Sequence, residues 1–270
     1  MYLRRLCCCC ALGLLAPWAA AWAPATHAYL ARRITGRSTP GIIYGAMAVD
    51  INGSVLDRSL GPKLSSLTHA DRNDLEAGDF ATGFATHNGQ SGTDYYIHLH
   101  YNPDAPEIWS TRKIRQFCRE FDIAPRIGEG LLDMTVEYLV RLECGPQFGI
   151  LIAQSAQDSH EHELADAFAE PLAQRAGIPR EKAALEIRRA ARAFQVLIQT
   201  YGNQLAHEEP YLRWLAHRAV VVLTGYDLET AREIFSRALD ICRDEYSREM
   251  TQICNEVRER MKAIPKYASP

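Results

Sequence analysis

Residues 180–201 read REKAALEIRRAARAFQVLIQTY, and this stretch decides the fold class. Its apolar residues recur every three or four positions, which is the spacing that places side chains on one face of an α-helix. Gly177 and Pro179 precede the stretch and Gly202 and Asn203 follow it, so both ends carry residues that interrupt helices. The pattern predicts one long amphipathic helix.

The same periodicity runs through most of the chain, and we find no convincing run of alternating apolar and polar residues that would indicate strands. We therefore expect an all-α, single-domain helical bundle. Further helices are predicted at about residues 24–34, 74–87, 109–121, 128–144, 148–176, 207–223 and 227–264. No repeat and no linker rich in Pro, Gly or Ser divides the mature chain, so one domain is expected over residues 22–270.

Composition excludes several classes of protein. The chain of 270 residues is 47% hydrophobic and 23% charged, which rules out a disordered or collagen-like protein. Its formal net charge is −3, so no strongly basic balance supports binding to duplex nucleic acid. Any polyanionic ligand would need a local binding site.

Residues 1–21 have the layout of a secretory signal peptide. Two arginines precede an apolar stretch over residues 6–17, and alanines at residues 19–21 supply a cleavage site. An uncleaved anchor is the alternative, but the apolar stretch is shorter than the ~18 to 20 residues of a membrane span. We expect cleavage after Ala21, a mature chain that begins at Trp22, and a secreted or periplasmic protein.

Export would place the cysteines of the mature chain, Cys118, Cys144, Cys242 and Cys254, in an oxidising compartment. Cys242 and Cys254 lie in one predicted helix, about 18 Å apart at 1.5 Å per residue. A disulfide needs Cα atoms within about 7 Å, so these two cannot pair with each other. If all four are oxidised, Cys118 and Cys144 each pair with the last helix. The alternative is four buried thiols that act as small apolar residues.

Histidines occur together with aspartates, most clearly in HNGQSGTDYYIHLH at residues 87–100. On a continuous helix His87, Asp94 and His98 share one face, because they are seven and then four residues apart. Imidazole nitrogens and carboxylate oxygens at such spacing suit zinc. His100, two residues beyond His98, would point elsewhere.

A second group is SHEHELAD at residues 159–166, inside the predicted helix 148–176. His162 and Asp166 are one helical turn apart and can bind one metal ion. His160 and Glu163 form a competing pair at three-residue spacing. The alternative is a hydrogen-bonded His–Asp pair with a purely structural role in the bundle.

Three more residues become candidates through their context. His27 follows closely after Trp22, whose free amino group and carbonyl oxygen would chelate a metal in the mature chain. Asp50 ends the apolar run YGAMAVD at residues 44–50, and His69 lies in a loop rich in Ser and Thr. Each has an ordinary alternative: a helix cap for Asp50 and a surface position for either histidine.

Taken in order, these motifs resemble the zinc-dependent phospholipase C family, which is similar in fold to the fungal single-strand-specific zinc nucleases. The resemblance covers residues 22 to about 202. It is carried by WAPATH at residues 22–27, YGAMAVDI at 44–51, Thr68-His69, FATH at 84–87, DYYIH at 94–98, HELAD at 162–166 and FQVLIQTYG at 194–202. It implies an all-helical protein with up to three zinc ions in a cleft.

The resemblance also implies how the zinc ions are held. One ion would bind Asp50, His69, His87 and Asp94. A second would bind the amino group and carbonyl of Trp22 together with His27 and Asp94, which makes Asp94 a bridging ligand. The third would bind His98, His162 and Asp166.

The chain departs from the family pattern in two places. Ser91 stands where the family has its bridging aspartate, so Asp94 requires an insertion of about one helical turn. Asp166 stands where the phospholipases have glutamate, although the nucleases use aspartate there. These departures bear on whether all three ions bind.

Bridged zinc ions lower the pKa of a shared water, so hydroxide is available near neutral pH for attack on a phosphodiester. The resemblance implies a secreted zinc phosphodiesterase that cleaves glycerophospholipids, with Asp50 also accepting the proton of the attacking water. Expected partners are a phospholipid or other phosphodiester substrate and a transiently contacted membrane surface, with the protein a monomer. The alternatives are a non-catalytic metal-binding envelope protein and a zinc nuclease.

Overall fold

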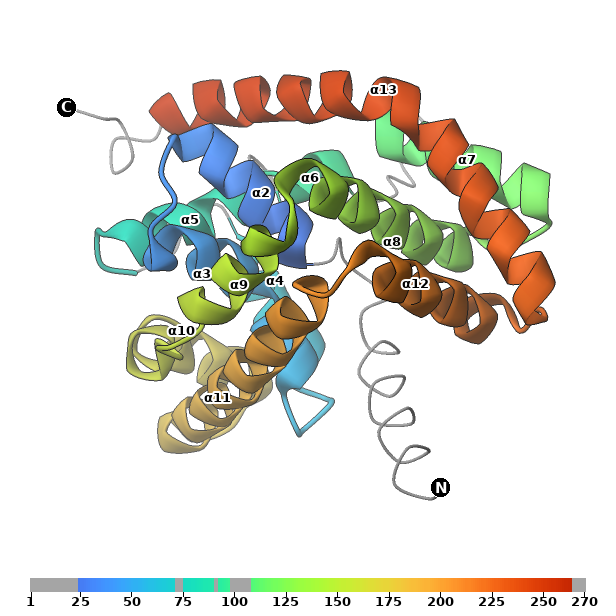
Figure 1. Cartoon of the computed structure of the whole chain (residues 1–270). Helices are drawn as coiled ribbons and strands as arrows, with labels where there is room; N and C mark the ends of the chain where they lie inside the picture. Colours follow the sequence, from blue (N-terminus) through green and yellow to red (C-terminus); the bar gives the residue numbers. More distant parts are fainter. Residues whose placement is uncertain (1–23, 71–74, 90–91, 98–107, 264–270) are drawn as a thin grey trace.

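The computed structural model describes residues 24–70, 75–89, 92–97 and 108–263 (Figure 1). Its helices are α2 (Pro24–Thr35), α3 (Pro40–Ala48), the 3₁₀ helix η2 (Val49–Ser54), α4 (Gly61–Thr68), α5 (Asp79–His87), α6 (Asp94–Ile97), α7 (Trp109–Phe121), α8 (Pro125–Cys144), α9 (Pro146–Ser155), α10 (Glu161–Ala176), α11 (Arg180–Leu205), α12 (Glu209–Thr224) and α13 (Leu228–Lys262). The described residues contain no strand and form one all-α domain, which confirms the predicted fold class. The predicted signal peptide lies outside them.

The predicted long amphipathic helix is α11. The side chains of Ala183, Ile187, Phe194 and Ile198 are buried along one face of it, with the three- and four-residue spacing on which the prediction rests. The helix continues past Gly202 to Leu205, and the absence of a side chain at Gly202 lets the backbone of α9 approach closely. A glycine read from sequence as a stop is here a packing residue.

The longest helix, α13, packs against α12, α8, α2 and α7, and Figure 1 shows it running along one side of the molecule. The Asp227 carboxylate begins the helix by accepting the backbone N–H groups of Glu229 and Thr230. This N-cap stabilises the first turn, where backbone N–H groups have no partner within the helix. Through its contacts with α2 and with α7 and α8, α13 packs the start of the chain against its middle.

Helices α3 and α5 pack with their backbones in direct contact. A Cβ atom on Gly45 of α3 would lie 2.2 Å from the carbonyl oxygen of Phe80, and one on Gly83 of α5 would lie 2.2 Å from that of Ile42. Only glycine permits this approach. Because His87 ends α5 and Asp50 follows α3 in η2, the crossing brings these two residues to the same region.

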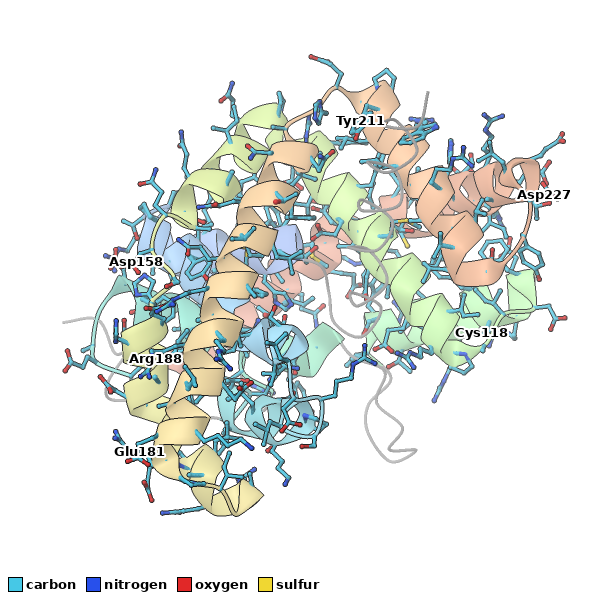
Figure 2. All side chains as sticks on the ribbon, turned by 90° about the horizontal axis from the view of Figure 1, so that it is seen from below. Cys118, Asp158, Glu181, Arg188, Tyr211 and Asp227 are labelled. Atoms are coloured by element: carbon cyan, nitrogen blue, oxygen red, sulfur yellow. The ribbon has the colours of Figure 1, made fainter. Side chains whose placement is uncertain are left out.

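One predicted helix is wrong for a physical reason. The single helix expected over residues 148–176 is two helices, α9 and α10. Between them the Asp158 side chain accepts the backbone N–H of His160 at 2.9 Å, and His160 has a left-handed backbone with φ of 48°. Such local side-chain bonds compete with the helix. Figure 2 labels Asp158 in this link, on the side of the molecule that also carries Arg188 of α11.

Helix α3 was not anticipated because it lacks an amphipathic pattern. Residues 42–48 are all buried, so the helix is apolar on every side and shows no helical period. Helix α5 begins at Asp79, directly after Gly78, whereas the sequence predicted a start at about residue 74. Elements of nine residues leave little room for a periodic signal.

The expected cross-links to the last helix are absent from the described residues, in which Cys118, Cys144, Cys242 and Cys254 are all free thiols. Cys242 and Cys254 are buried in the core and the other two are partly buried. Burial raises the pKa of Cys144 to about 11 and that of Cys242 to about 12. These side chains behave as small apolar residues, which is the alternative considered from the sequence.

None of the described helices combines the length and the apolar character that crossing a bilayer demands.

Candidate metal centre

Asp50, His69, His87 and Asp94 lie together, and we call them the His–Asp cluster. Nε2 of His69 is 3.4 Å from Oδ1 of Asp50 and 3.9 Å from Oδ1 of Asp94. Nε2 of His87 is 3.8 Å from Oδ2 of Asp50 and 3.5 Å from Oδ1 of Asp94. Each imidazole therefore faces both carboxylates, and the four donor groups converge.

Backbone carbonyls fix both imidazoles of the cluster. Nδ1 of His87 lies 2.7 Å from the carbonyl oxygen of Ala46 in α3, and Nδ1 of His69 lies 3.0 Å from that of Ser65 in α4. A carbonyl oxygen only accepts hydrogen bonds, so each Nδ1 donates. In the neutral ring Nε2 then carries the lone pair and points at the carboxylates. This arrangement is typical of metal-binding histidines.

A loop, not a continuous helix, brings Asp94 to the cluster. α5 ends at His87 and α6 begins at Asp94, so the expectation that these residues share one face of a single helix is wrong. The backbone N–H of Thr93 bonds the carbonyl of Thr86 at 2.7 Å, which folds the chain back. A Cβ atom on Gly92 would lie 2.4 Å from the backbone nitrogen of Asn88, so this tight return needs glycine.

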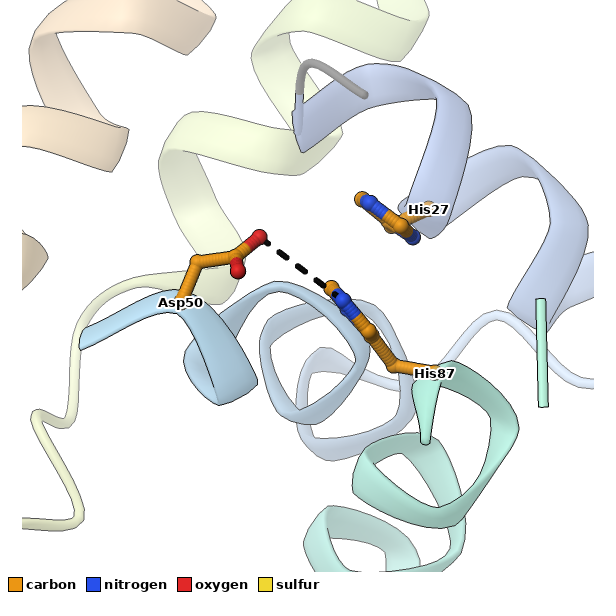
Figure 3. Close-up of side chains that lie close together, drawn as sticks. All are labelled: His27, Asp50 and His87. Atoms are coloured by element: carbon orange, nitrogen blue, oxygen red, sulfur yellow. Dashed lines mark ion pairs between the residues drawn. The ribbon is translucent and has the colours of Figure 1, made fainter. Parts of the chain in front are cut away.

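His27 lies directly against the cluster. Its ring stacks on that of His87, with centroids 3.7 Å apart and planes 13° from parallel (Figure 3). Nδ1 of His27 is 3.3 Å from the Thr93 hydroxyl oxygen. Ligand atoms within 4.8 Å of one another define two overlapping groups, one of His27, Asp50 and His87 and the other of His69, His87 and Asp94. His87 belongs to both.

The cluster is largely withdrawn from solvent. The His87 side chain is fully buried, and those of Asp94, His69 and Asp50 are 11%, 18% and 23% exposed. Burial by itself would raise the pKa of Asp50, but the imidazoles of His87, His69 and His27 outweigh burial and hold that pKa at about 2. Burial would lower the pKa of His69, but the carboxylates of Asp50 and Asp94 raise it above its ordinary value.

Two of the residues expected to hold the third ion, His162 and Asp166, lie on α10. Both are exposed, and the Nε2 atom of His162 is 3.4 Å from a carboxylate oxygen of Glu161. In the competing pair, Nδ1 of His160 lies 3.0 Å from Oε2 of Glu163. The ring of His160 stacks on Phe80 at 3.9 Å. Neither pair belongs to a metal-capable group among the described residues.

Two expected ligands, Trp22 and His98, lie outside the described residues, as does His100. Sequence reasoning also missed residues that support the site. Thr93 touches His27, and the carbonyl groups of Ala46 and Ser65 orient the two imidazoles. A backbone carbonyl has no signature in residue type, so only the fold reveals these contacts.

The donor atoms of the His–Asp cluster are spaced nearly as they would be around a small dication. Four-coordinate zinc with ligand bonds of about 2.0–2.2 Å has neighbouring ligand atoms roughly 3.3–3.6 Å apart. The contacts in the cluster measure 3.4–3.9 Å, slightly wider. Two carboxylates and two neutral imidazoles would balance the charge of one Zn²⁺ in a buried setting. The two overlapping groups could hold metal ions, and their geometry leaves the metal's identity open.

No protein-family model, no curated protein and no solved structure matches the chain.

Proposed function

We propose that the chain is a secreted zinc-dependent phosphodiesterase of the phospholipase C type. The observation that supports this function is the His–Asp cluster, in which two imidazoles each face two carboxylates at 3.4–3.9 Å. His27, stacked on His87, offers a further donor for a second ion. Nitrogen and oxygen ligands in this mixture are common in zinc hydrolases.

When bound, zinc acts as a Lewis acid that lowers the pKa of a coordinated water and polarises a phosphoryl oxygen. The chain's own residues hold and orient it. Asp50 and His69 are the most exposed members of the cluster, so a substrate would approach from their side. The resemblance also gives Asp50 a second role, as acceptor of the proton of the attacking water.

The substrate class rests on the family resemblance, which favours glycerophospholipids over other phosphodiesters. Such a substrate requires transient contact with a membrane surface, which a monomer can make. The proposal includes export by way of residues 1–21. Amino-terminal sequencing of the exported protein should find Trp22 first, and a different start would remove its amino group from the set of ligands.

The central test combines metal analysis with substrate assays on the purified exported protein. We expect one or two zinc ions per chain and release of phosphocholine from phosphatidylcholine vesicles, with little hydrolysis of single-stranded DNA. The His87→Ala variant should lose both metal and activity. A protein that binds no zinc, or that cleaves only DNA, would contradict the proposal.

A non-catalytic metal-binding envelope protein is the second candidate. The two departures from the family pattern, Ser91 in place of the bridging aspartate and Asp166 in place of glutamate, favour it. If these departures leave the third ion unbound, the chain lacks one source of charge stabilisation for a leaving group. Stoichiometric zinc with no hydrolysis of either substrate would support this second function.

A further inference from the structure

Glu137 of α8 is a buried carboxyl group bonded to the start of α2. Its Oε1 atom accepts the backbone N–H of Thr26 at 2.6 Å and the Thr26 hydroxyl at 2.9 Å. The first N–H groups of any helix have no partner within that helix. Glu137 supplies such a partner from a residue 111 positions away along the chain. It therefore caps α2 in the way that a local N-cap residue would.

Burial of a carboxyl group in this place is unfavourable if the side chain only fills space. Glu137 is 7% exposed, and its Oε2 atom has no hydrogen-bond partner within the described part of the chain. Burial raises the pKa of Glu137 to about 8, although hydrogen bonds from Thr26 and the backbone of Ala25 act to lower it. A buried polar atom without a partner destabilises the fold. This unfavourable burial indicates a role beyond filling space.

The residue next to the capped one is His27. Thr26 and His27 are both almost fully buried, so neither has room to reorient alone. The His27 ring lies over that of His87, and its Nδ1 atom lies 3.3 Å from the Thr93 hydroxyl oxygen. A shift in the first turn of α2 would carry His27 away from Asp50 and His87, with which it forms a metal-capable group.

We propose that Glu137 is a positioning residue of the metal centre, which fixes the first turn of α2 and thereby holds His27 stacked on His87. This inference rests on the metal-binding part of the proposed function and adds a residue from α8 to that site. It requires no hydrolytic activity.

The first experiment uses the metal-free protein and NMR of the histidine rings. Stacking on His87 should shift the ring protons of His27 upfield in the wild type. Glu137→Ala should abolish this shift. Glu137→Gln should retain it, because the glutamine oxygen can accept the same two bonds from Thr26. Unchanged His27 shifts in a folded Glu137→Ala variant would overturn the inference.

The second experiment titrates the same variants with Co²⁺ and records its visible absorption. We expect Glu137→Ala to weaken Co²⁺ affinity about tenfold or more and to alter the spectrum, with both effects rescued in Glu137→Gln. If the wild type binds no Co²⁺ or Zn²⁺, the proposed function fails, whereas the NMR experiment still tests the positioning of His27.

Glu143 provides a matched control on the same helix. It also lies on α8 and also bonds α2, but through the side chain of Tyr29, whose hydroxyl donates to it at 2.7 Å. Glu143→Ala should leave the His27 shifts and the Co²⁺ spectrum unchanged, even if it lowers the thermal midpoint. Equal effects of Glu137→Ala and Glu143→Ala would show a general loss of packing between α8 and α2 and would overturn the inference.

Discussion

At the scale of single residues, Asp94 and Asp166 have the same chemistry and opposite surroundings. Asp94 faces His69 and His87 in the cluster, whereas Asp166 is exposed on α10. We expect Asp94→Asn to weaken zinc binding at least about tenfold, because it removes a charged ligand, and Asp166→Asn to leave it unchanged. Calorimetric titration with zinc measures both. Equal losses in the two variants would show that the metal binds elsewhere.

The low pKa of Asp50 predicts how the metal-free protein responds to acid. A carboxyl group whose folded pKa, about 2, lies below its ordinary 3.8 stabilises the fold above that ordinary value. The contribution is lost as pH falls from about 4 towards 2. We expect the wild type to lose about 2 kcal/mol more stability than Asp50→Asn over this range.

Urea unfolding in the presence of a chelator, at several acidic pH values, checks this expectation. The comparison with Asp50→Asn removes the effect of other carboxyl groups, which titrate in both proteins. Parallel pH profiles for the two proteins would mean that the imidazoles do not stabilise the Asp50 carboxylate.

At the scale of elements, the site depends on the crossing of α3 and α5. We expect Gly83→Ala to destabilise the protein by about 1–3 kcal/mol, because its methyl group would meet the Ile42 carbonyl oxygen. The same change should weaken zinc binding, since α5 carries His87 and α3 carries its Ala46 partner. Chemical denaturation and zinc titration measure the two effects.

Gly53→Ala serves as the control for this change. No heavy atom lies within 4 Å of a Cβ atom built on Gly53, so its free energy of unfolding should change by no more than about 0.5 kcal/mol. If both alanine variants behaved alike, the close contact between α3 and α5 would not govern stability.

The sequence allowed the longer elements to be predicted and left the short ones open. α11 and α13 have long periodic patterns, and residues that interrupt helices lie near their ends, so their existence follows from the sequence. α3 is apolar on all sides, and α6 has only four residues, so neither shows a period. Asp94 was singled out for its chemistry, but its route to the cluster depends on Gly92 and the bond from Thr93 to Thr86. Such a turn cannot be inferred from spacing.

At the scale of the whole molecule, metal binding should stabilise the fold. A ligand that binds only the folded state at 100 times its Kd adds about 2.7 kcal/mol. For a chain of this size we expect zinc to raise the thermal midpoint by roughly 5–10 °C. The shift should be larger at pH 8 than at pH 6, because a proton on His69, whose pKa is raised, competes with the metal.

Differential scanning calorimetry with zinc and with a chelator checks this expectation. The double variant Asp50→Asn, Asp94→Asn should show no shift, since it lacks both carboxylates of the cluster. An equal shift in the double variant would place the stabilising metal at a different site.

Contacts between distant parts of the chain explain why part of the site was not predictable from the sequence. Glu137 and Thr26 are 111 residues apart, and no motif links a glutamate in the middle of the chain to a threonine near its start. His162 and Asp166 have the spacing of a metal-binding pair, yet the break at Asp158–His160 sets the start and the orientation of α10. Long-range packing decides which of several plausible pairs faces the interior.

The spacing of the cluster along the chain has a consequence for folding kinetics. All four members lie between residues 50 and 94, so the loops that must close are short and their entropy cost is small. The cap on α2 must wait for α8, which lies much farther along the chain. In pulse-labelling hydrogen exchange, amides of α3 and α5 should therefore gain protection before those at the start of α2, with His27 the last donor to reach its place.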